Sequence, residues 1–335
     1  MDFKKIKLVL EGEPAYRLKQ VYKGIFGELI ENWAEMTTLP KQLREKLEQQ
    51  CSLSIKSKIF EAQDKQTAKA LVFLEDGNRI ETVLMRHGDG RNTVCVSTQV
   101  GCPMGCDFCA TGKLGLKRNL TSGEIVEQVL LFSRFLKKEK DAVTNVVFMG
   151  MGEPMLNYEN VMEAVRILNN KDGFNIGARK ISISTCGIVE GINKLSNEPL
   201  QINLAISLHA PNNELRSQIM PVNKTYDIDK LFEALKNYTG KTKNRITIEY
   251  ILLAGINDSE KEAFELSRLL LKKLGKLFMV NLIPYNETGK YKAPTKEAIN
   301  AFKNELRLNG VEVSQRYRFG HDIEGACGQL AAKDL

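Results

Sequence analysis

The spacing of the cysteines constrains this chain more than any other feature of its sequence. Four of the seven cysteines fall within residues 95–109, namely Cys95, Cys102, Cys106 and Cys109. The count is odd and the charged start MDFKKIKLVL does not resemble a secretory signal, so we expect no disulfide framework. Clustered thiols in such a chain predict a metal site or redox chemistry.

The composition is that of a globular protein. Hydrophobic residues make up 43% and charged residues 27% of the 335 residues, which excludes a disordered or fibrous chain. No apolar run approaches the roughly 18–20 residues of a membrane span. The formal net charge of +7 permits a polyanionic partner without requiring one. We therefore expect a cytoplasmic, monomeric protein that does not enter a membrane.

Hydrophobic patterns divide the chain into two predicted domains. In residues 1–92, RLKQVYKGIF and LPKQLREKLEQQ have helical spacing, and KALVFLEDGNRIETVLM predicts a hairpin that turns at Asp76-Gly77. We expect a small accessory α+β domain here, with a hinge at residues 88–92. Residues 93–335 form the second predicted domain.

Strand and helix patterns alternate through the second domain. The strands are rich in Val and Ile, as expected when both faces of a sheet are covered. Repeated β-then-α order predicts an α/β fold with a parallel sheet, and about six βα units predict a partial (β/α)6 barrel rather than an eight-fold one. Strands are expected at residues 93–97, 144–149, 180–184, 202–207, 246–253, 277–283 and 311–317, and helices near 121–138, 157–170, 188–196, 227–238, 258–274 and 294–309. Thr121 with Glu124, Asp227 and Asp258 are the predicted helix caps.

The motif CPMGCDFC, at residues 102–109, directly follows the first of these strands. Structural zinc sites use four protein ligands, and no fourth ligand is evident nearby. Three thiolates suit an iron–sulfur cluster that leaves one iron open for a further ligand. Gly101 and Gly105 allow the loop to fold tightly around such a cluster. A zinc knuckle completed by Cys95 or a distant residue is the alternative.

Polar residues also gather where the predicted strands end. GMGEP, at residues 150–154, follows the second strand, and its Glu153 suits an ammonium group. Other strands end at Ser184, at Ser207-Leu208-His209 and at Pro284-Tyr285-Asn286. Because the carboxyl ends of parallel strands form the functional face of a βα barrel, these positions together predict one site.

The cysteine motif, with an aromatic residue before its last cysteine, resembles the cluster loop of radical S-adenosylmethionine (SAM) enzymes. The resemblance implies one [4Fe–4S] cluster per chain, held by Cys102, Cys106 and Cys109, with SAM chelating the open iron. It also implies reductive cleavage of SAM to methionine and a 5′-deoxyadenosyl radical, chemistry that belongs to the cofactor. The SAM contacts of that family correspond here to Gly152, Glu153, Ser184, Ser207, Leu208, His209 and Asn286.

Two further motifs narrow the resemblance. Cys95 lies in CVSTQVGC, and Cys327 lies in DIEGACGQL near the end of the sequence. These motifs resemble the RlmN and Cfr family of radical SAM enzymes, which methylate adenosine carbons in RNA. The resemblance implies that one SAM methylates Cys327 and that a second generates a radical, after which the S-methyl carbon of Cys327 adds to adenine. Cys95 then attacks the Cys327 sulfur, which releases methylated RNA and leaves a disulfide.

The same resemblance gives a proton acceptor and a substrate. Glu81 matches the position that takes the proton from the ring carbon. RlmN-type enzymes methylate C2 of one adenosine in the peptidyl transferase region of 23S rRNA and of the adenosine beside the anticodon in some tRNAs. Cfr-type enzymes methylate C8 of the same rRNA base and confer antibiotic resistance. GMGEP and NLIPYN favour C2, and a flavodoxin- or ferredoxin-type electron donor is implied.

Basic residues that contact RNA are harder to identify from the sequence. Lys113, Lys117 and Arg118 follow the cluster loop, and Arg316 and Arg318 precede Cys327. Charge runs are usually solvated faces. If these residues line one groove, each contact with a duplex phosphate would make RNA binding more sensitive to salt.

Alternatives to C2 methylation remain open at the level of sequence. One is C8 methylation of the same rRNA base. Another is a radical SAM activase of a protein partner, which would not need Cys327. The last is a zinc-stabilised RNA-binding protein without enzymatic activity.

Overall fold

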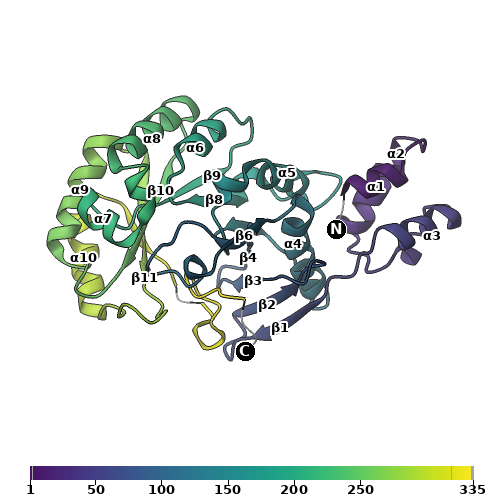
Figure 1. Ribbon diagram of the computed structural model, residues 1–335, viewed down its shortest axis with the longest axis horizontal. Helices are drawn as coiled ribbons and strands as arrows, with labels where there is room; N and C mark the ends of the chain where they lie inside the picture. Colours follow the sequence, from purple (N-terminus) through teal and green to yellow (C-terminus); the bar gives the residue numbers. More distant parts are fainter. Residues whose placement is uncertain (2, 318, 333–335) are drawn as a thin grey trace.

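The computed structural model describes residues 1, 3–317 and 319–332 of the chain. Its centre is a ten-stranded sheet whose linear strand order leaves it unclosed, as predicted for a partial barrel (Figure 1). In spatial order its strands are β1 (Ser57–Glu61), β2 (Thr67–Phe73), β3 (Arg79–Arg86), β4 (Asn92–Cys95), β7 (Asn145–Phe148), β8 (Ile181–Thr185), β9 (Asn203–Ser207), β10 (Ile246–Leu252), β11 (Phe278–Pro284) and β12 (Val313–Gln315).

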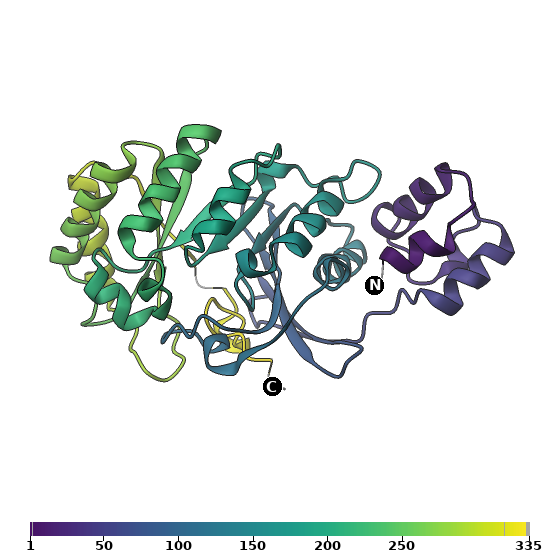
Figure 2. The same ribbon diagram turned by 45° about the horizontal axis from the view of Figure 1, so that its top comes forward.

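The barrel strands β4 and β7–β12 pair in parallel, which confirms the repeated βα order. Helices on the outside of the curved sheet connect them, and α8, α9 and α10 follow one another around it (Figures 1 and 2). No described helix is both long and apolar enough to span a bilayer. The helices are α1 (Phe3–Val9), α2 (Tyr16–Tyr22), α3 (Lys41–Gln50), α4 (Ser122–Lys137), α5 (Tyr158–Asn169), α6 (Val189–Leu195), α7 (Asn213–Ile219), α8 (Ile228–Thr242), α9 (Glu260–Leu274) and α10 (Lys296–Leu308).

Side-chain caps determine where several of these helices begin. Thr121 and Glu124 form the predicted capping box at the start of α4, and Asp227 accepts a hydrogen bond from the Lys230 amide at the start of α8. The prediction of Asp258 as the cap of α9 was wrong, because Ser259 occupies that position in a capping box of its own.

The helices α1–α3 form a separate layer beside α4, at the right of Figure 1. The buried Trp33 lies at its centre, and its indole nitrogen donates a hydrogen bond to the Cys51 carbonyl. Cys51 is itself buried, as expected for a structural cysteine. Arg134 of α4 donates a hydrogen bond of 2.9 Å to the Leu53 carbonyl and so ties this layer to the barrel.

The predicted hairpin is confirmed, but its strands are not an independent sheet. β2 and β3 pair antiparallel around the turn at Asp76-Gly77, and β3 pairs antiparallel with β4 of the barrel. Residues 88–92, expected as a hinge, form a tight turn in which the His87 and Arg91 backbones are hydrogen-bonded. The sheet therefore runs without interruption through residue 92, and the division into two domains there stays a prediction.

Five short α-helices and strands were not predicted from the sequence: α1, β1, β5, β6 and α7. β5 (Gln99–Cys102) and β6 (Gly115–Asn119) form a small antiparallel sheet that brackets the cysteine motif. The short helix α7 begins after Asn212, whose side chain accepts a hydrogen bond from the Leu215 amide. Each of the five is at most seven residues long, and β5 and β6 lack the Val- and Ile-rich pattern that identifies the equally short barrel strands.

We predict that Gly101→Ala will disturb the base of the cysteine loop. Gly101 has φ +78°, and a Cβ there would lie 1.8 Å from the Gly115 carbonyl oxygen of β6. Left-handed strain and the clash together should lower the free energy of unfolding by about 2–5 kcal/mol, measured by chemical denaturation. Gly77→Ala is the matched control, because Gly77 has φ +80° and open space around it. An equal loss in both variants would show that the contact with β6 is unimportant.

Candidate active site

Polar side chains meet at the carboxyl ends of the parallel strands, as the sequence predicts. One cavity of about 810 Å³ opens there and brings together residues from the cysteine loop and from strands β7 to β10. Its lining includes Cys102, Cys106, Cys109, Gly152, Glu153, Ser184, Ser207 and His209. Leu208 is fully buried in the core and does not line this cavity, and Asn286 lines a second cavity beside it.

The cysteine loop presents its three thiols to this cavity. Burial raises the pKa of the Cys102 thiol to about 12 and raises that of Cys106 further, and the charge of Cys109 contributes to both shifts. Among the described residues, no three Cys, His, Asp or Glu side chains converge closely enough to hold a single metal ion. The three thiols instead share one cavity wall, as suits a multi-iron core in which each thiolate binds a different iron. A cationic core would offset the mutual repulsion of these thiolates, so the residues fit a [4Fe–4S] cluster.

Glu153 is fixed at the floor of the cavity. One carboxylate oxygen accepts a 2.9 Å hydrogen bond from the Met155 amide and the other a 2.8 Å hydrogen bond from the Cys186 amide. Burial nevertheless raises the pKa of the Glu153 carboxyl. A ligand ammonium group would stabilise this buried charge, so Glu153 fits the amino group of SAM.

The glycines of GMGEP have a packing role of their own. A Cβ on Gly150 would lie 2.7 Å from the Ser97 hydroxyl oxygen, and one on Gly152, at φ +102°, would lie 2.6 Å from the Gln99 side chain. The close approach that these glycines permit is thus to the segment that leads from β4 into the first residue of β5. That packing sets the position of Glu153 relative to the cysteine loop.

The other side of the cavity is a hydrogen-bonded wall. Ser184 donates a 3.2 Å hydrogen bond to Glu249 of β10 and lies 3.5 Å from the Ser207 hydroxyl. The Nδ1 of His209 accepts a 3.0 Å hydrogen bond from the Ile251 amide. Burial lowers the pKa of His209 to about 3, so this imidazole is neutral and carries its proton on Nε2.

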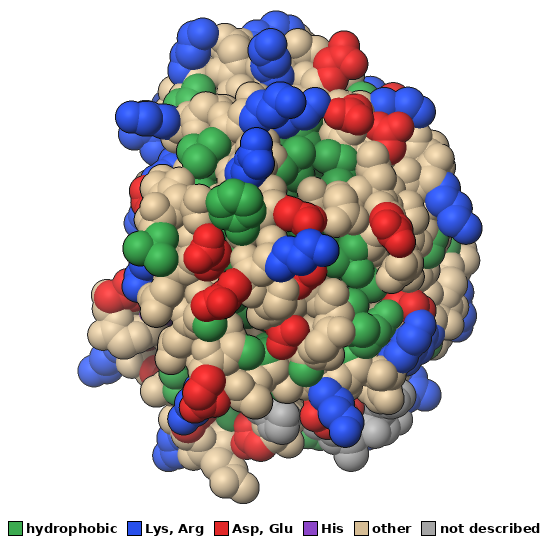
Figure 3. All heavy atoms as spheres, turned by 90° about the vertical axis from the view of Figure 1, so that its left-hand side faces the viewer, with side chains coloured by type: hydrophobic (Ala, Val, Ile, Leu, Met, Phe, Trp, Pro, Cys, Tyr) green, Lys and Arg blue, Asp and Glu red, His purple; other side chains and the backbone are tan. Residues whose placement is uncertain are grey.

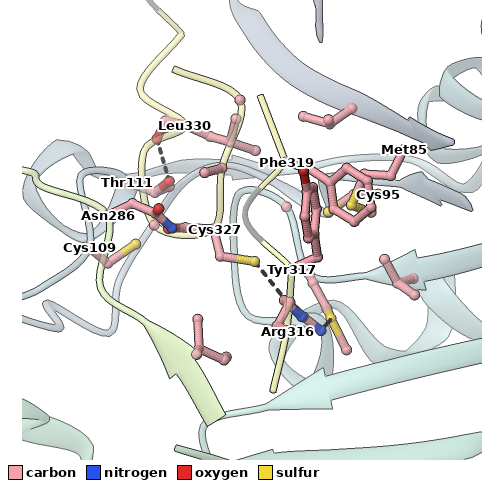
Figure 4. Close-up of a pocket in the computed structure, with 18 of the residues that line it drawn as sticks. Met85, Cys95, Cys109, Thr111, Asn286, Arg316, Tyr317, Phe319, Cys327 and Leu330 are labelled. Atoms are coloured by element: carbon pink, nitrogen blue, oxygen red, sulfur yellow. Dashed lines mark hydrogen bonds between the residues drawn. The ribbon is translucent and has the colours of Figure 1, made fainter. Parts of the chain in front are cut away.

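A second cavity, of about 740 Å³, contains both cysteines outside the cluster motif that the sequence singled out. Cys95 at the end of β4 and Cys327 in the C-terminal segment both line it, together with Asn286 (Figure 4). The two cavities share lining residues, among them Cys109 and Cys327, so they are adjacent. The buried side-chain oxygen of Asn286 has no hydrogen-bond partner, which suits a ligand donor.

Cys95 and Cys327 are both free thiols in this structure. Burial and, to a smaller extent, the nearby charge of Cys327 raise the pKa of Cys95, and Arg316 opposes them, so that the pKa is about 12. The Cys327 sulfur accepts a 2.9 Å hydrogen bond from Arg316 (Figure 4). The structure therefore brings together two thiols that are 232 positions apart in the sequence (327 − 95 = 232).

Two charged residues of the site were not predicted there from the sequence. Arg316 was expected elsewhere, and Glu249 was not singled out at all. Arg316 was expected to contact RNA, yet its guanidinium points into the site and lies 3.0 Å from a Glu249 carboxylate oxygen. Glu249 lies within an apolar strand pattern and lines the first cavity. A carboxylate among Ile, Tyr and Leu in a buried strand was the available signal, because buried charges are almost always paired.

Glu81 lies on β3 and is almost completely buried. It forms an ion pair of 2.9 Å with Lys69, which is equally buried. Its other carboxylate oxygen accepts hydrogen bonds of 2.7 and 3.0 Å from the amides of Ala331 and Ala332. Glu81 is not among the described residues that line the two cavities. Leu330, which directly precedes these alanines, lines the second cavity.

The remaining basic residues expected at an RNA groove have protein partners. Arg118 is bound to Asp76 and Glu124, Lys117 to Asn78, and Lys113 to the Thr288 carbonyl. Arg318 lies outside the described residues. On the molecular face shown in Figure 3, Lys and Arg side chains gather towards the top and upper left. Below them basic and acidic side chains are interspersed, with hydrophobic side chains scattered among them.

Comparison with known families matches both parts of the chain. Residues 96–267 match the Radical SAM superfamily. Residues 7–53 match the Ribosomal RNA large subunit methyltransferase N-terminal domain. The second match covers the end of α1 and all of α2 and α3, and it ends before β1.

Full-length relatives agree with these matches. The probable dual-specificity RNA methyltransferase RlmN of Dictyoglomus thermophilum is 47% identical, covering 99% of this chain and 95% of the relative. The corresponding protein of Thermotoga sp. is 48% identical, covering 97% and 93%. The crystal structure of a radical SAM methyltransferase from Sphaerobacter thermophilus superposes with a TM-score of 0.93 at 46% identity, covering 98% of this chain and 96% of that one. The chain therefore belongs to the RlmN family of radical SAM RNA methyltransferases.

Proposed function

We propose that this protein methylates C2 of a specific adenosine in the peptidyl transferase region of 23S rRNA and of the adenosine next to the anticodon in some tRNAs. The observation that carries the proposal is the pair of free thiols, Cys95 and Cys327, in a cavity adjoining the cysteine loop. An enzyme that only cleaved SAM would need the loop alone. Relatives named as dual-specificity RNA methyltransferases support the two RNA substrates.

The first cavity is proposed to hold the cofactors. Cys102, Cys106 and Cys109 would ligate one [4Fe–4S] cluster, which supplies the one-electron chemistry that starts the reaction when SAM is bound. Gly152, Glu153, Ser184, Ser207, Leu208, His209 and Asn286 are the proposed SAM residues. Leu208 would act through its backbone, because its side chain is buried away from the cavity.

The second cavity is proposed to hold the target base next to Cys327. Cys327 accepts a methyl group from one SAM, and its S-methyl carbon forms the new bond to adenine after a second SAM has been used. Glu81 takes the proton from the ring carbon. Cys95, as a thiolate, then attacks the Cys327 sulfur, so that an S–S bond forms and the bond between this sulfur and the methylene carbon breaks. The methylene carbon leaves with the bonding electrons and takes up a proton, which completes the methyl group on the base. A route of this kind is needed because C2 of adenine is electron-poor and does not attack a SAM methyl group.

The reaction also needs a source of electrons. Regeneration of the two thiols and reduction of the cluster require electrons, for which we propose a flavodoxin- or ferredoxin-type donor. We propose that the protein acts as a monomer in the cytoplasm, where its RNA substrates are made.

The decisive experiment is an anaerobic assay with SAM labelled in its methyl group. Cluster-loaded protein, a low-potential reductant and either an rRNA fragment or tRNA should give labelled 2-methyladenosine after nuclease digestion and mass spectrometry. The Cys106→Ala variant should lose both cluster absorbance and labelling, because two thiols cannot retain the cluster. Label at C8, or in a protein rather than RNA, would contradict the proposal.

Cys95→Ala should trap the enzyme on its substrate. Without this thiol nothing attacks the Cys327 sulfur, so RNA should stay covalently bound to Cys327 after one turnover. A denaturing gel followed by peptide mapping measures the adduct. Cys51→Ala is the matched control, because Cys51 is also a buried cysteine but lines neither cavity. Free RNA and free protein in the Cys95 variant would exclude its role.

Resolution of the adduct should accelerate with pH. Burial holds the pKa of Cys95 near 12, well above neutrality, so the reactive thiolate fraction increases as the pH rises towards that value. Between pH 7 and pH 9 the rate of adduct decay should increase about tenfold per pH unit, because each unit below the pKa changes the thiolate fraction tenfold. Rapid quenching with gel analysis measures this rate. A decay rate that does not change with pH would contradict the assignment of a buried Cys95 thiol as the attacking group.

A further inference from the structure

The ion pair between Lys69 and Glu81 is the most deeply buried pair of opposite charges in the described part of the chain. Both side chains are about 2% exposed, and Lys69 Nζ lies 2.9 Å from Glu81 Oε1. The pairing register sets Lys69 opposite Val83 and Leu71 opposite Glu81, so the two charges are diagonal neighbours on one face of the β2–β3 hairpin. Burying two charges is costly, and the pair is not needed to join these strands, which are already hydrogen-bonded along their length.

The two oxygens of Glu81 have different kinds of partner. Oε1 faces Lys69, which is part of a strand in the centre of the hairpin sheet. Oε2 accepts hydrogen bonds from the amides of Ala331 and Ala332, in the same segment that carries Cys327. Leu330 of that segment lines the second cavity, so the segment lies between Oε2 and the proposed position of the base. Any movement of this segment would change the partners of Oε2 and leave those of Oε1 in place.

We infer that Lys69 is a positioning residue for the proton acceptor: it holds the Glu81 carboxylate through Oε1 so that Oε2 is the atom that receives the proton from the adenine ring. The inference rests on the proposed role of Glu81. In this arrangement the C-terminal segment covers Oε2 until it moves, and the ammonium of Lys69 compensates the buried carboxylate while Oε2 is exposed. Lys69 itself touches neither the base nor SAM.

The inference is tested with cluster-loaded protein carrying Lys69→Met, compared with Glu81→Gln. Lys69→Met removes the ammonium and keeps most of the side-chain volume. It should lower RNA methylation by about 100-fold, the lower end of what a general base contributes. Methylation of Cys327 should be unchanged, and the covalent protein–RNA adduct should accumulate as in Glu81→Gln, because the stalled step follows adduct formation. Lys69→Arg should restore part of the turnover, and Lys65→Met, at an exposed lysine of the β1–β2 turn, is the control expected to behave as wild type.

The outcomes separate this inference from the proposal on which it depends. Full turnover of Glu81→Gln without adduct would refute Glu81 as the proton acceptor. Adduct in Glu81→Gln but not in Lys69→Met would refute only the role of Lys69. If Lys69→Met does not fold, the double variant Lys69→Met/Glu81→Gln removes both charges, and its turnover should equal that of Glu81→Gln alone. A further loss in the double variant would show that Lys69 acts independently of Glu81 and would overturn the inference.

Discussion

The guanidinium of Arg316 links the two cavities of this active site, and the arrangement of both depends on it. It donates to the Cys327 sulfur on one side and pairs with Glu249 on the other, and Glu249 in turn accepts a hydrogen bond from Ser184. A continuous polar chain therefore runs from the wall proposed to bind SAM to Cys327, the proposed methyl acceptor. Because an unpaired buried charge costs several kcal/mol, neither the wall nor the Cys327 segment can be altered at this point without disturbing the other.

The pairing of β3 with β4 explains why a hairpin outside the cluster-binding strands belongs to the same site. Val83 lies opposite Cys95 in this antiparallel register, and side chains alternate along a strand, so Glu81 shares a sheet face with Cys95. A slip of one residue would turn Glu81 to the opposite face. The proposed role of Glu81 as proton acceptor therefore requires a single sheet that continues through residue 92.

Much of this arrangement could be predicted from the sequence because its signals are local. The cysteine motif, GMGEP and the polar residues at strand ends are short patterns whose positions follow from parallel-strand topology. The contacts of Arg316 could not be predicted in this way, because they join segments distant in sequence. Arg316 was expected on the surface, since a charged residue among polar neighbours usually is. Lys69 and Glu81 lie in the predicted hairpin, but their ion pair depends on its exact register and on burial by the C-terminal segment. The small β5–β6 sheet was missed because its strands, QVGC and GLKRN, lack the Val- and Ile-rich pattern of the barrel strands.

The proposed roles of the two thiols place different demands on Cys95, which is buried, and on Cys327, which is partly buried. In the proposed reaction Cys95 is kept from reacting before an adduct exists, and its raised pKa would do this by keeping it protonated. The proposal also requires Cys327 to move between a SAM methyl group and the base, and Gly320 and Gly328, with φ of +59° and +85°, give its segment conformations that other residues rarely adopt. Arg316 acts on both thiols: its charge lowers the pKa of Cys95, and its hydrogen bond holds Cys327 within the same cavity. A single cation can therefore favour both the attacking thiolate and the position of the sulfur that it attacks.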